Sequence, residues 1–218
     1  MTFKENDFIK IDFDIYANGE LVQTTNEKKG KDANLKINEY GPQSIIVGKG
    51  FVLPALDEAV KKKDKDTLNL KTEDAYGKRK KELLKTFPKS SFDEQKIRPV
   101  VGITYDFNGM YGTVKSVVGG RVMVDFNNPL SGKEIKIDYN VVSKMDDICD
   151  KLSVVLESIL RIPNNMFELT CKDKEVTLKA PEQIVQVKEM LSKAFTEAVP
   201  EFKDYTLKTE VLEIKAQN

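Results

Sequence analysis

The stretch from Val122 to Val142 constrains the fold of this chain more than any other segment. It begins as an alternating strand pattern, breaks at Asn127-Asn128-Pro129, turns at Ser131-Gly132 and resumes as a second alternating run from Ile135 to Tyr139. Period-two alternation indicates a strand with one buried face, and Asn, Pro, Ser and Gly indicate the turn between two such strands. This pattern is typical of a chain that leaves an inserted domain and returns to the sheet from which it departed.

The residues before the insert predict half-buried strands and one short helix. Phe8 to Tyr16 alternate strictly between apolar and polar side chains, and Asn18-Gly19 is a strong hairpin signal. Pro54 is well placed for the first turn of a helix within FVLPALDEAVKKK. We expect strands at 8–16, 20–25, 44–47 and 67–71, a polar loop at 26–33, a helix at 51–63 and a turn at 74–77.

Residues 87–132 predict a small inserted β unit. Pro88 and Pro99 bracket a loop, and three strands then follow, joined by turns at Asn108-Gly109 and Gly119-Gly120. The strands are expected at 103–107, 110–117 and 121–126. Residues 1–86 and 133–143 then form one discontinuous domain.

Residues 144–218 predict a separate α/β module with the order helix, two strands, helix, strand. Ser143 can cap the first helix, and Pro181 can open the second. The strands are expected at 166–171, 175–179 and 205–214, in an antiparallel sheet backed by the two helices.

The composition excludes several kinds of active site. The chain contains no histidine, so it has no Ser-His-Asp or Cys-His nucleophile system and no histidine general base or zinc ligand. Its 35 basic and 35 acidic residues give zero net charge, and hence no overall attraction to nucleic acid or membrane. The basic run Lys78 to Lys81 is compatible with a solvated loop or with contact to an anionic partner.

The two cysteines and the N-terminus bear on cofactors and location. Cys149 and Cys171 fall on a predicted helix and strand with no further cysteine or histidine near either, so we expect buried structural thiols rather than a disulfide or a metal site. We expect no cofactor and no metal. The chain has no apolar leader and no run of roughly 18 apolar residues, which predicts a cytoplasmic location.

Two motifs and their order resemble the FKBP-type peptidyl-prolyl cis-trans isomerases: GKGFVLPALDEAV, from Gly48, and EDAYGKR, from Glu73. The insert resembles the insert-in-flap domain of the SlyD-like branch, and VDFNNPLSGKEIK is close to the signature of that branch. The whole arrangement resembles the long archaeal members, in which a C-terminal domain serves oligomerisation. The resemblance implies an α+β fold: an FKBP-like half-open antiparallel sheet wrapping a short helix, an inserted small β domain and a C-terminal α/β module that forms a homodimer.

The resemblance also implies an apolar pocket in which X-Pro bonds isomerise without a nucleophile, base or cofactor. Tyr76 would donate its hydroxyl, and Leu53 its backbone amide, to substrate carbonyls. Taken singly, the apolar members of the pocket are also typical core residues. The pocket residues implied by the resemblance are Phe13, Val22, Gln23, Val52, Leu53, Leu56, Tyr76 and Ile137.

Three of these positions depart from the family pattern. The family usually has aspartate where Gln23 stands, and aromatic residues are common where Val22 and Ile137 stand. A less aromatic pocket holds proline more loosely. The alternative to an isomerase is therefore a holdase chaperone that keeps the FKBP scaffold with little or no catalysis.

The insert carries more apolar side chains than a unit of its size can easily bury. These side chains either fill its core or form a surface that holds unfolded chains, as the SlyD-like resemblance implies. Expected partners are unfolded or proline-containing polypeptides, with no nucleic acid and no membrane. The candidate client-binding residues are Ile97, Val100, Val101, Tyr105, Phe107, Met110 and Tyr111.

Overall fold

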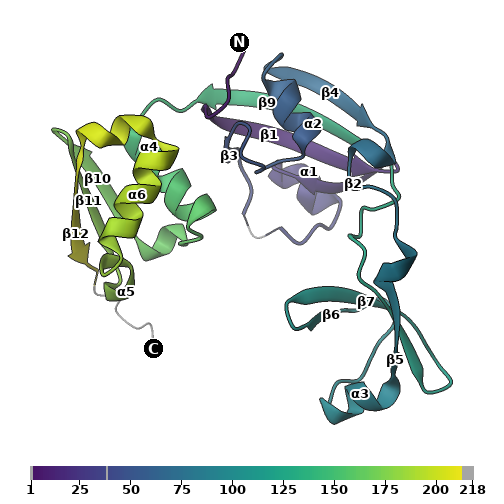
Figure 1. Ribbon diagram of the computed structural model, residues 1–218. Coiled ribbons are helices and arrows are strands. Elements are labelled where there is room, and N and C mark those ends of the chain that lie inside the picture. The colour runs from purple at the N-terminus through teal and green to yellow at the C-terminus, as the bar shows by residue number, and fades with distance from the viewer. Residues whose placement is uncertain (1, 38, 213–218) are drawn as a thin grey trace. The chain divides into compact units, whose positions relative to one another are not determined.

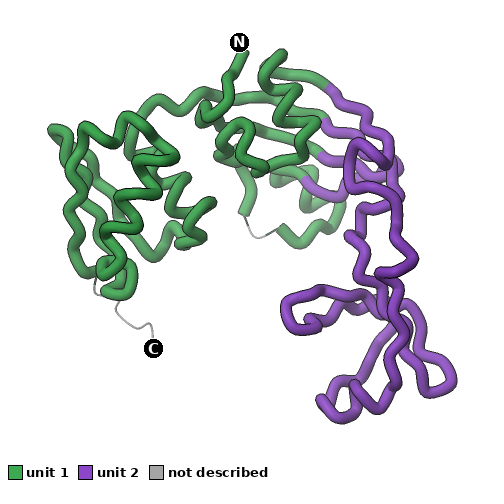
Figure 2. The backbone as a smooth tube through the Cα atoms, viewed as in Figure 1, with its two compact units in different colours: residues 1–14, 24–66, 138–218 green, residues 15–23, 67–137 purple. Residues whose placement is uncertain are grey.

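The computed structural model of the protein describes residues 2–37 and 39–212, which form a mixed α+β structure of three sheets and several helices (Figure 1). By compactness the chain divides into two units (Figure 2). Unit 1 comprises residues 1–14, 24–66 and 138–218, and unit 2 comprises residues 15–23 and 67–137. No helix of the described residues is long and apolar enough to span a bilayer.

The first sheet has the strand order β2-β1-β9-β4, with β3 paired to β1. The strand that follows the insert, β9, thus lies beside the first strand of the chain, as the junction after Val122 predicted. Asn18 and Gly19 both have positive φ, 51° and 86°, which is the backbone of the tight hairpin turn expected between β1 and β2. The strands of this sheet are β1 (Phe8–Ala17), β2 (Glu20–Thr24), β3 (Gln43–Ile46), β4 (Lys65–Leu70) and β9 (Ile135–Lys144).

Two helices belong to this part of the chain, and only one was predicted. Helix α2 (Pro54–Val60) begins with proline in its first turn, as expected, and buries Leu56 and Val60. The loop predicted at 26–33 is wrong, because α1 (Glu27–Asp32) lies there. Its polar sequence has no apolar stripe, and the helix depends instead on the Asn26 side chain, whose Oδ1 accepts from the Lys29 N–H at 3.0 Å.

The insert contains a four-stranded sheet of order β5-β8-β7-β6 rather than three strands. The predicted Pro88–Pro99 loop is also wrong in part, because its first half forms α3 (Lys89–Glu94), with Pro88 at its N-cap. Phe92 on that helix joins a buried core with Val114, Val122 and Val124. The strands of the insert are β5 (Leu84–Pro88), β6 (Thr104–Phe107), β7 (Met110–Val118) and β8 (Arg121–Asp125).

The C-terminal module has the predicted order of elements, but its sheet is mixed. Strand β11 (Glu175–Ala180) pairs antiparallel with β10 (Glu168–Lys172) and parallel with β12 (Thr206–Val211), so the expected antiparallel sheet is wrong. The crossover through the helices between β11 and β12 brings the last strand back in parallel. Of the final strand predicted at 205–214, Glu213 and Ile214 lie outside the described residues.

The helices of this module begin and break differently from the sequence prediction. Strand β9 extends through Ser143 to Lys144, so Ser143 caps no helix. The cap is Asp147, whose Oδ1 accepts from the Asp150 N–H at 3.1 Å. The predicted second helix is divided in two after Pro181. The helices are α4 (Ile148–Val154), continued by the π-helical turn η3 (Val155–Ile159), α5 (Glu182–Val185) and α6 (Lys188–Ala198).

Short 3₁₀ helices occupy several connections. They are η1 (Thr72–Asp74), η2 (Lys81–Leu83), η4 (Asn164–Met166) and η5 (Pro200–Asp204). Phe202 on η5 is buried against Phe195 of α6, with 5.2 Å between ring centroids, and so contributes to the core of the C-terminal module.

Cys149 of α4 and Cys171 of β10 form a disulfide, which corrects the expectation of two separate thiols. Their Cα atoms are 5.9 Å apart, within the range that a disulfide requires. The packing of α4 against the strand, rather than any sequence spacing, brings the two side chains together. The bond closes a loop over a sequence separation of 22 residues.

We expect reduction of this disulfide to destabilise the C-terminal module by about 3 kcal/mol, because the crosslink removes loop-closure entropy from the unfolded chain. Urea unfolding followed by circular dichroism, with and without a phosphine reductant, measures the change. The variant Cys149→Ser/Cys171→Ser is the control and should be insensitive to reductant. A wild-type midpoint that does not move on reduction would contradict the prediction.

Candidate functional site

Four of the predicted pocket residues lie in unit 1, on β1 and at the start of α2. Phe13 of β1 and Leu56 of α2 are buried, whereas Val52 and Leu53, just before the helix, are half-buried. The Leu53 carbonyl accepts from the Leu56 N–H at 2.8 Å and so begins the helix. Among the described residues the Leu53 N–H itself has no hydrogen-bond acceptor, and it therefore remains available to a ligand.

The turn before α2 is fixed to the helix by a buried carboxylate. Asp57 accepts from the Gly48 N–H at 3.1 Å and is almost fully buried. Gly48 has a φ of +80°, which residues other than glycine rarely adopt, so the backbone of this turn favours glycine. The first glycine of the GKG motif thus belongs to the turn that the Asp57 carboxylate holds against α2.

The other four predicted residues lie in unit 2. Val22 is half-buried and Gln23 exposed on β2, Ile137 is fully buried on β9, and Tyr76 is half-buried after η1. Burial raises the pKa of Tyr76 above its ordinary value, so its phenol stays protonated and can donate. No described residue accepts a hydrogen bond from the Tyr76 hydroxyl. That all eight residues form one pocket stays a prediction.

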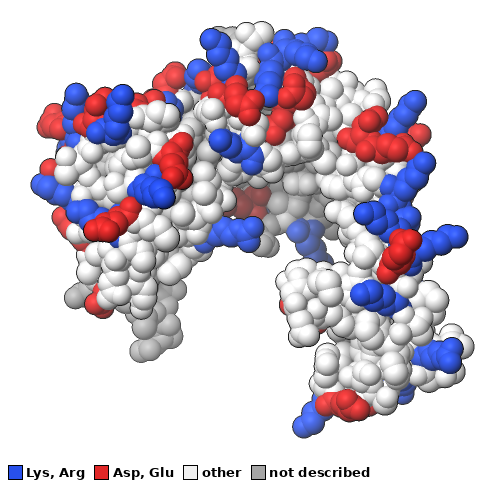
Figure 3. Space-filling model, viewed as in Figure 1, with Lys and Arg blue, Asp and Glu red and all other residues white. Residues whose placement is uncertain are grey.

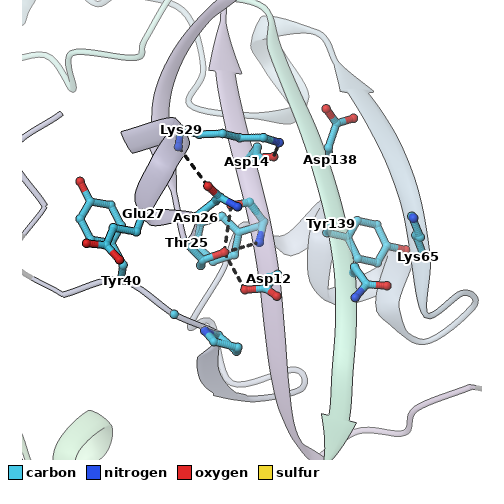
Figure 4. A pocket seen from close by; sticks show the side chains of 14 residues that line it. Asp12, Asp14, Thr25, Asn26, Glu27, Lys29, Tyr40, Lys65, Asp138 and Tyr139 are labelled. Carbon is cyan, nitrogen blue, oxygen red and sulfur yellow. Dashed lines mark hydrogen bonds and ion pairs between the residues drawn. The ribbon is translucent and has the colours of Figure 1, made fainter. Parts of the chain in front are cut away.

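A polar cavity of about 620 Å³ opens beside β1 and α1 (Figure 4). Asp14 is buried there and accepts from Thr24 Oγ1 and Lys29 Nζ, both at 2.5 Å, while Asp12 accepts from Thr25 Oγ1 at 2.8 Å. Phe13 is the only predicted pocket residue that lines this cavity. Its carboxylates and lysines do not suit a proline ring, so this cavity is not the predicted site.

The seven predicted client-binding residues of the insert divide into two groups. Ile97, Tyr105 and Phe107 are half-buried against the core of the insert, as a structural role requires. The other four are exposed, with Tyr111 the most exposed at 70% and Val101 at 59%. The exposed members are Val100, Val101, Met110 and Tyr111.

The insert exposes further apolar side chains that the sequence prediction missed, Ile103, Val118 and Met123 among them. Eight of the thirteen large apolar side chains exposed in the described residues lie between 84 and 123, in a segment that makes up about a fifth of the chain. Charged side chains are correspondingly sparse over much of the insert surface seen in Figure 3. The alternating pattern of the strands did not identify Ile103 and Val118 as exposed, because Ile103 precedes β6 and Val118 is the last residue of β7.

Four phenylalanines of the insert line a second cavity, of about 340 Å³. The rings of Phe87, Phe107 and Phe126 contact one another, with the centroid of Phe107 5.7 Å from Phe87 and 5.2 Å from Phe126, and 6.1 Å between Phe87 and Phe126. Phe92 is the fourth, Met110 lies at the edge of the cavity, and Lys85 Nζ stands 5.7 Å from the centroid of Phe126. The cavity therefore has an aromatic part that suits an apolar side chain, and a polar part formed by Lys85, Ser91, Gln95, Asp106 and Asn108.

Two segments, 76–83 and 125–133, connect the insert to the first sheet, and we call them the neck. The Asp125 side chain is only 2% exposed, forms an ion pair with Arg79, and accepts from the Asn127 side-chain amide at 2.8 Å. Asn127 also bonds both backbone groups of Lys80, accepting from its N–H at 2.8 Å and donating to its carbonyl at 3.0 Å. One side chain thus joins both segments.

The neck also accounts for much of the basic run. Arg79 is held by Asp125, and Lys78 pairs with Glu73 at 2.8 Å, while Lys80 and Lys81 are exposed. Arg79 therefore has a structural role. For the lysines of this run, the structure favours neither a solvated loop nor a contact to an anionic partner. The sequence prediction identified Asn127 and Ser131 only as turn residues.

Comparison with known proteins gives the same family as the two motifs. The family model of the FKBP26 IF domain matches residues 85–130. The short-type peptidyl-prolyl cis-trans isomerase of Methanocaldococcus jannaschii is 29% identical over 63% of this chain and 91% of its own length. The SlyD isomerase of Helicobacter pylori is 29% identical over 46% of this chain and 58% of its own length. A probable 16 kDa FKBP-type isomerase of Pseudomonas fluorescens is also 29% identical, over 57% of this chain and 79% of its own length.

The chain is similar to FKBP-type isomerases over more than half of its length, and its insert matches the IF domain of FKBP26. The similarity extends to SlyD, as the SlyD-like type with an insert-in-flap domain requires. Strand β5 begins at Leu84 and β8 ends at Asp125, so the matched residues cover nearly the whole sheet of the insert.

We expect Asn127→Ala to destabilise the protein by about 1–3 kcal/mol, because Asp125 and the backbone of Lys80 lose partners in a largely buried place. The adjacent Asn128→Ala is the control, since Asn128 is exposed and accepts one hydrogen bond, from the Leu130 N–H. Urea unfolding followed by circular dichroism compares the variants. Equal losses of stability in the two would show that the Asn127 bonds add nothing.

Proposed function

We propose that this chain is an FKBP-type peptidyl-prolyl cis-trans isomerase and folding helper. The observation that carries the proposal is a pair of unused donors at the family motif positions, the Leu53 N–H and the Tyr76 hydroxyl, which have no acceptor among the described residues. Three FKBP-type or SlyD relatives bear the name isomerase, which supports the same activity. Val52, directly before Leu53, is half-buried, and Tyr76 itself is half-buried.

The proposed mechanism needs no proton transfer. The barrier to rotation about a peptide bond, roughly 18–20 kcal/mol, comes from amide resonance, which the twisted transition state loses. The transition state is therefore less polar at the carbonyl oxygen than the planar ground state, and transfer from water into an apolar pocket favours it. Leu53 and Tyr76 would hold the neighbouring carbonyls of the substrate so that the X-Pro bond lies against Phe13 and Val52. A chain without histidine can catalyse this reaction.

A holdase chaperone with weak or no catalysis is the second candidate. Gln23 is exposed, and Leu56 and Ile137 are fully buried, so these three residues present little apolar surface to a substrate. Their burial agrees with a core role. Holding a client would then depend on the insert alone.

We expect the wild-type protein at micromolar concentration to accelerate cis-to-trans conversion of a short proline peptide in a protease-coupled assay. Tyr76→Phe should lower kcat/KM about 2–10-fold, the effect of one hydrogen bond, and leave the unfolding midpoint unchanged, because the hydroxyl has no partner among the described residues. Tyr205→Phe, in the C-terminal module, is the control and should retain full activity. A wild-type rate no higher than the uncatalysed rate would exclude the isomerase and leave the holdase.

The insert is proposed to hold unfolded chains through its exposed apolar side chains. Val101 and Tyr111 are more than half exposed and lie outside the core of the insert, so they are free to contact a client. Met110 is exposed too, and its flexible thioether suits contact with many sequences. The phenylalanine-lined cavity of the insert can accept an apolar side chain of the client.

We expect Val101→Ser/Tyr111→Ser to weaken suppression of aggregation of a refolding client severalfold without lowering stability by more than about 0.5 kcal/mol, since both side chains are exposed. Val142→Ser is the control, because Val142 is also exposed, at 49%, but lies on β9, outside the insert. Light scattering of the client measures suppression. An equal loss for Val142→Ser would show that suppression does not depend on the exposed surface of the insert.

The C-terminal module is proposed to pair two copies of the chain, as in the long archaeal members that the sequence resembles. Val187 and Met190, at and near the start of α6, and Val211 on β12 are exposed apolar side chains that a partner copy could cover. Two inserts on one dimer would bind a single client with greater avidity. The cytoplasmic location stays a proposal as well, and the Cys149–Cys171 disulfide bears on it, because such bonds are rare in most reducing cytosols.

A further inference from the structure

The turn that carries Tyr76 is held to the far side of the neck by two hydrogen bonds. Ser131 Oγ donates to the Tyr76 carbonyl at 3.0 Å, and the Gly132 N–H donates to the Gly77 carbonyl at 2.8 Å. Ser131 is only 6% exposed, so its hydroxyl bond forms away from water. These bonds join residues more than fifty positions apart in the chain.

The Tyr76 turn is also closed by a bond within its own segment. The turn is closed on its own side by the Gly77 N–H, which donates to the Thr72 carbonyl at 2.7 Å. Gly77 has a φ of +70°, so the backbone reverses direction immediately after the tyrosine. Because the hydroxyl of Tyr76 has no hydrogen-bond partner among the described residues, no such bond fixes the end of the side chain, and the backbone of the turn sets the direction in which the side chain leaves it.

The Ser131 bond is the last of a continuous series that begins at the sheet of the insert. The Phe126 N–H donates to the Leu83 carbonyl at 2.9 Å, next to the first pair of β5 and β8. Asn127 then bonds Lys80, and Ser131 bonds Tyr76. The two segments of the neck therefore stay side by side from the insert to the Tyr76 turn, all within unit 2.

We propose that Ser131 is a positioning residue for Tyr76: its hydroxyl holds the turn so that the tyrosine can donate to a substrate carbonyl. The proposal rests on the proposed isomerase function for its catalytic consequence, but not for its geometry. Ser131 lies on the segment by which the chain leaves the insert. It therefore links the backbone of the client-holding domain to a donor of the predicted pocket.

A double-mutant cycle in the full chain tests the proposal. Ser131→Ala should lower kcat/KM for a short proline peptide about 3–10-fold in the wild-type background and less than twofold in the Tyr76→Phe background, because Ser131 acts through Tyr76. Ser131→Thr, which keeps the hydroxyl, should retain more of the activity. Ser143→Ala, an exposed serine on β9, is the control and should leave the rate unchanged.

A second measurement does not depend on catalysis. Burial raises the pKa of Tyr76, so a looser turn that exposes the ring should bring this pKa down towards its ordinary value. Carbon-13 NMR of tyrosine Cζ, with the Tyr76 signal assigned by Tyr76→Phe, follows the titration in wild type and Ser131→Ala. We expect a fall in the variant and none in Ser143→Ala.

The outcomes separate the two proposals. An inactive wild type would remove the isomerase, and the Tyr76 titration would then decide the positioning role by itself. An active wild type in which Ser131→Ala has no effect, or an equal effect in both backgrounds, would overturn the positioning role. An unchanged Tyr76 titration in Ser131→Ala would overturn it as well.

Discussion

The buried carboxylate of Asp125 is the interaction on which the insert and its connection depend. A buried charge is costly unless it is paired and hydrogen-bonded, and Asp125 meets both needs with Arg79 and Asn127. Arg79 lies on the segment entering the insert and Asp125 on the strand leaving it. The carboxylate is therefore satisfied only when the two segments lie side by side, and the same arrangement sets β5 against β8 in register from Leu84 and Asp125 onward.

The connection from β8 to β9 is short, and it has to meet several geometrical demands at once. Asn127 bonds across the neck, Ser131 bonds the Tyr76 turn, and Gly132 turns with a φ of +81°. A Cβ on Gly132 would stand 3.2 Å from the Arg79 side chain, so a larger residue would disturb the partner of Asp125. The glycine at position 132 and the ion pair between Arg79 and Asp125 therefore depend on the same packing around the Arg79 side chain.

Local periodicity predicted the elements that depend on a buried face and missed those that depend on caps or on distant contacts. The strands of the first sheet and α2 were predicted because their apolar spacing is regular. Helix α1 was missed because it depends on the Asn26 cap and on a pair between Glu27 and Lys31. The parallel pairing of β12 and the disulfide were missed because both follow from tertiary packing.

The candidate site was predicted as a set of residues, through the family resemblance, and not as a surface. The sequence could not distinguish half-buried Val52 from fully buried Ile137, because both are apolar residues in apolar patterns. It also gave no sign of the polar cavity beside α1. The walls of that cavity come from β1, α1 and β9, which are distant in sequence, and α1 itself was expected to be a loop.

Both proposed roles of the chain depend on apolar side chains, which would form an open surface on the insert and a pocket in the isomerase site. A 46-residue insert with four phenylalanines in and around its core has little interior left, so Val100, Val101 and Tyr111 remain outside. An open apolar surface can hold a chain but cannot favour a twisted peptide bond over a planar one. Catalysis further requires donors that fix the neighbouring carbonyls, and we propose the Leu53 N–H and the Tyr76 hydroxyl for this role. In this proposal the difference between holding and isomerising a client depends on two hydrogen-bond donors and on the backbone that positions them.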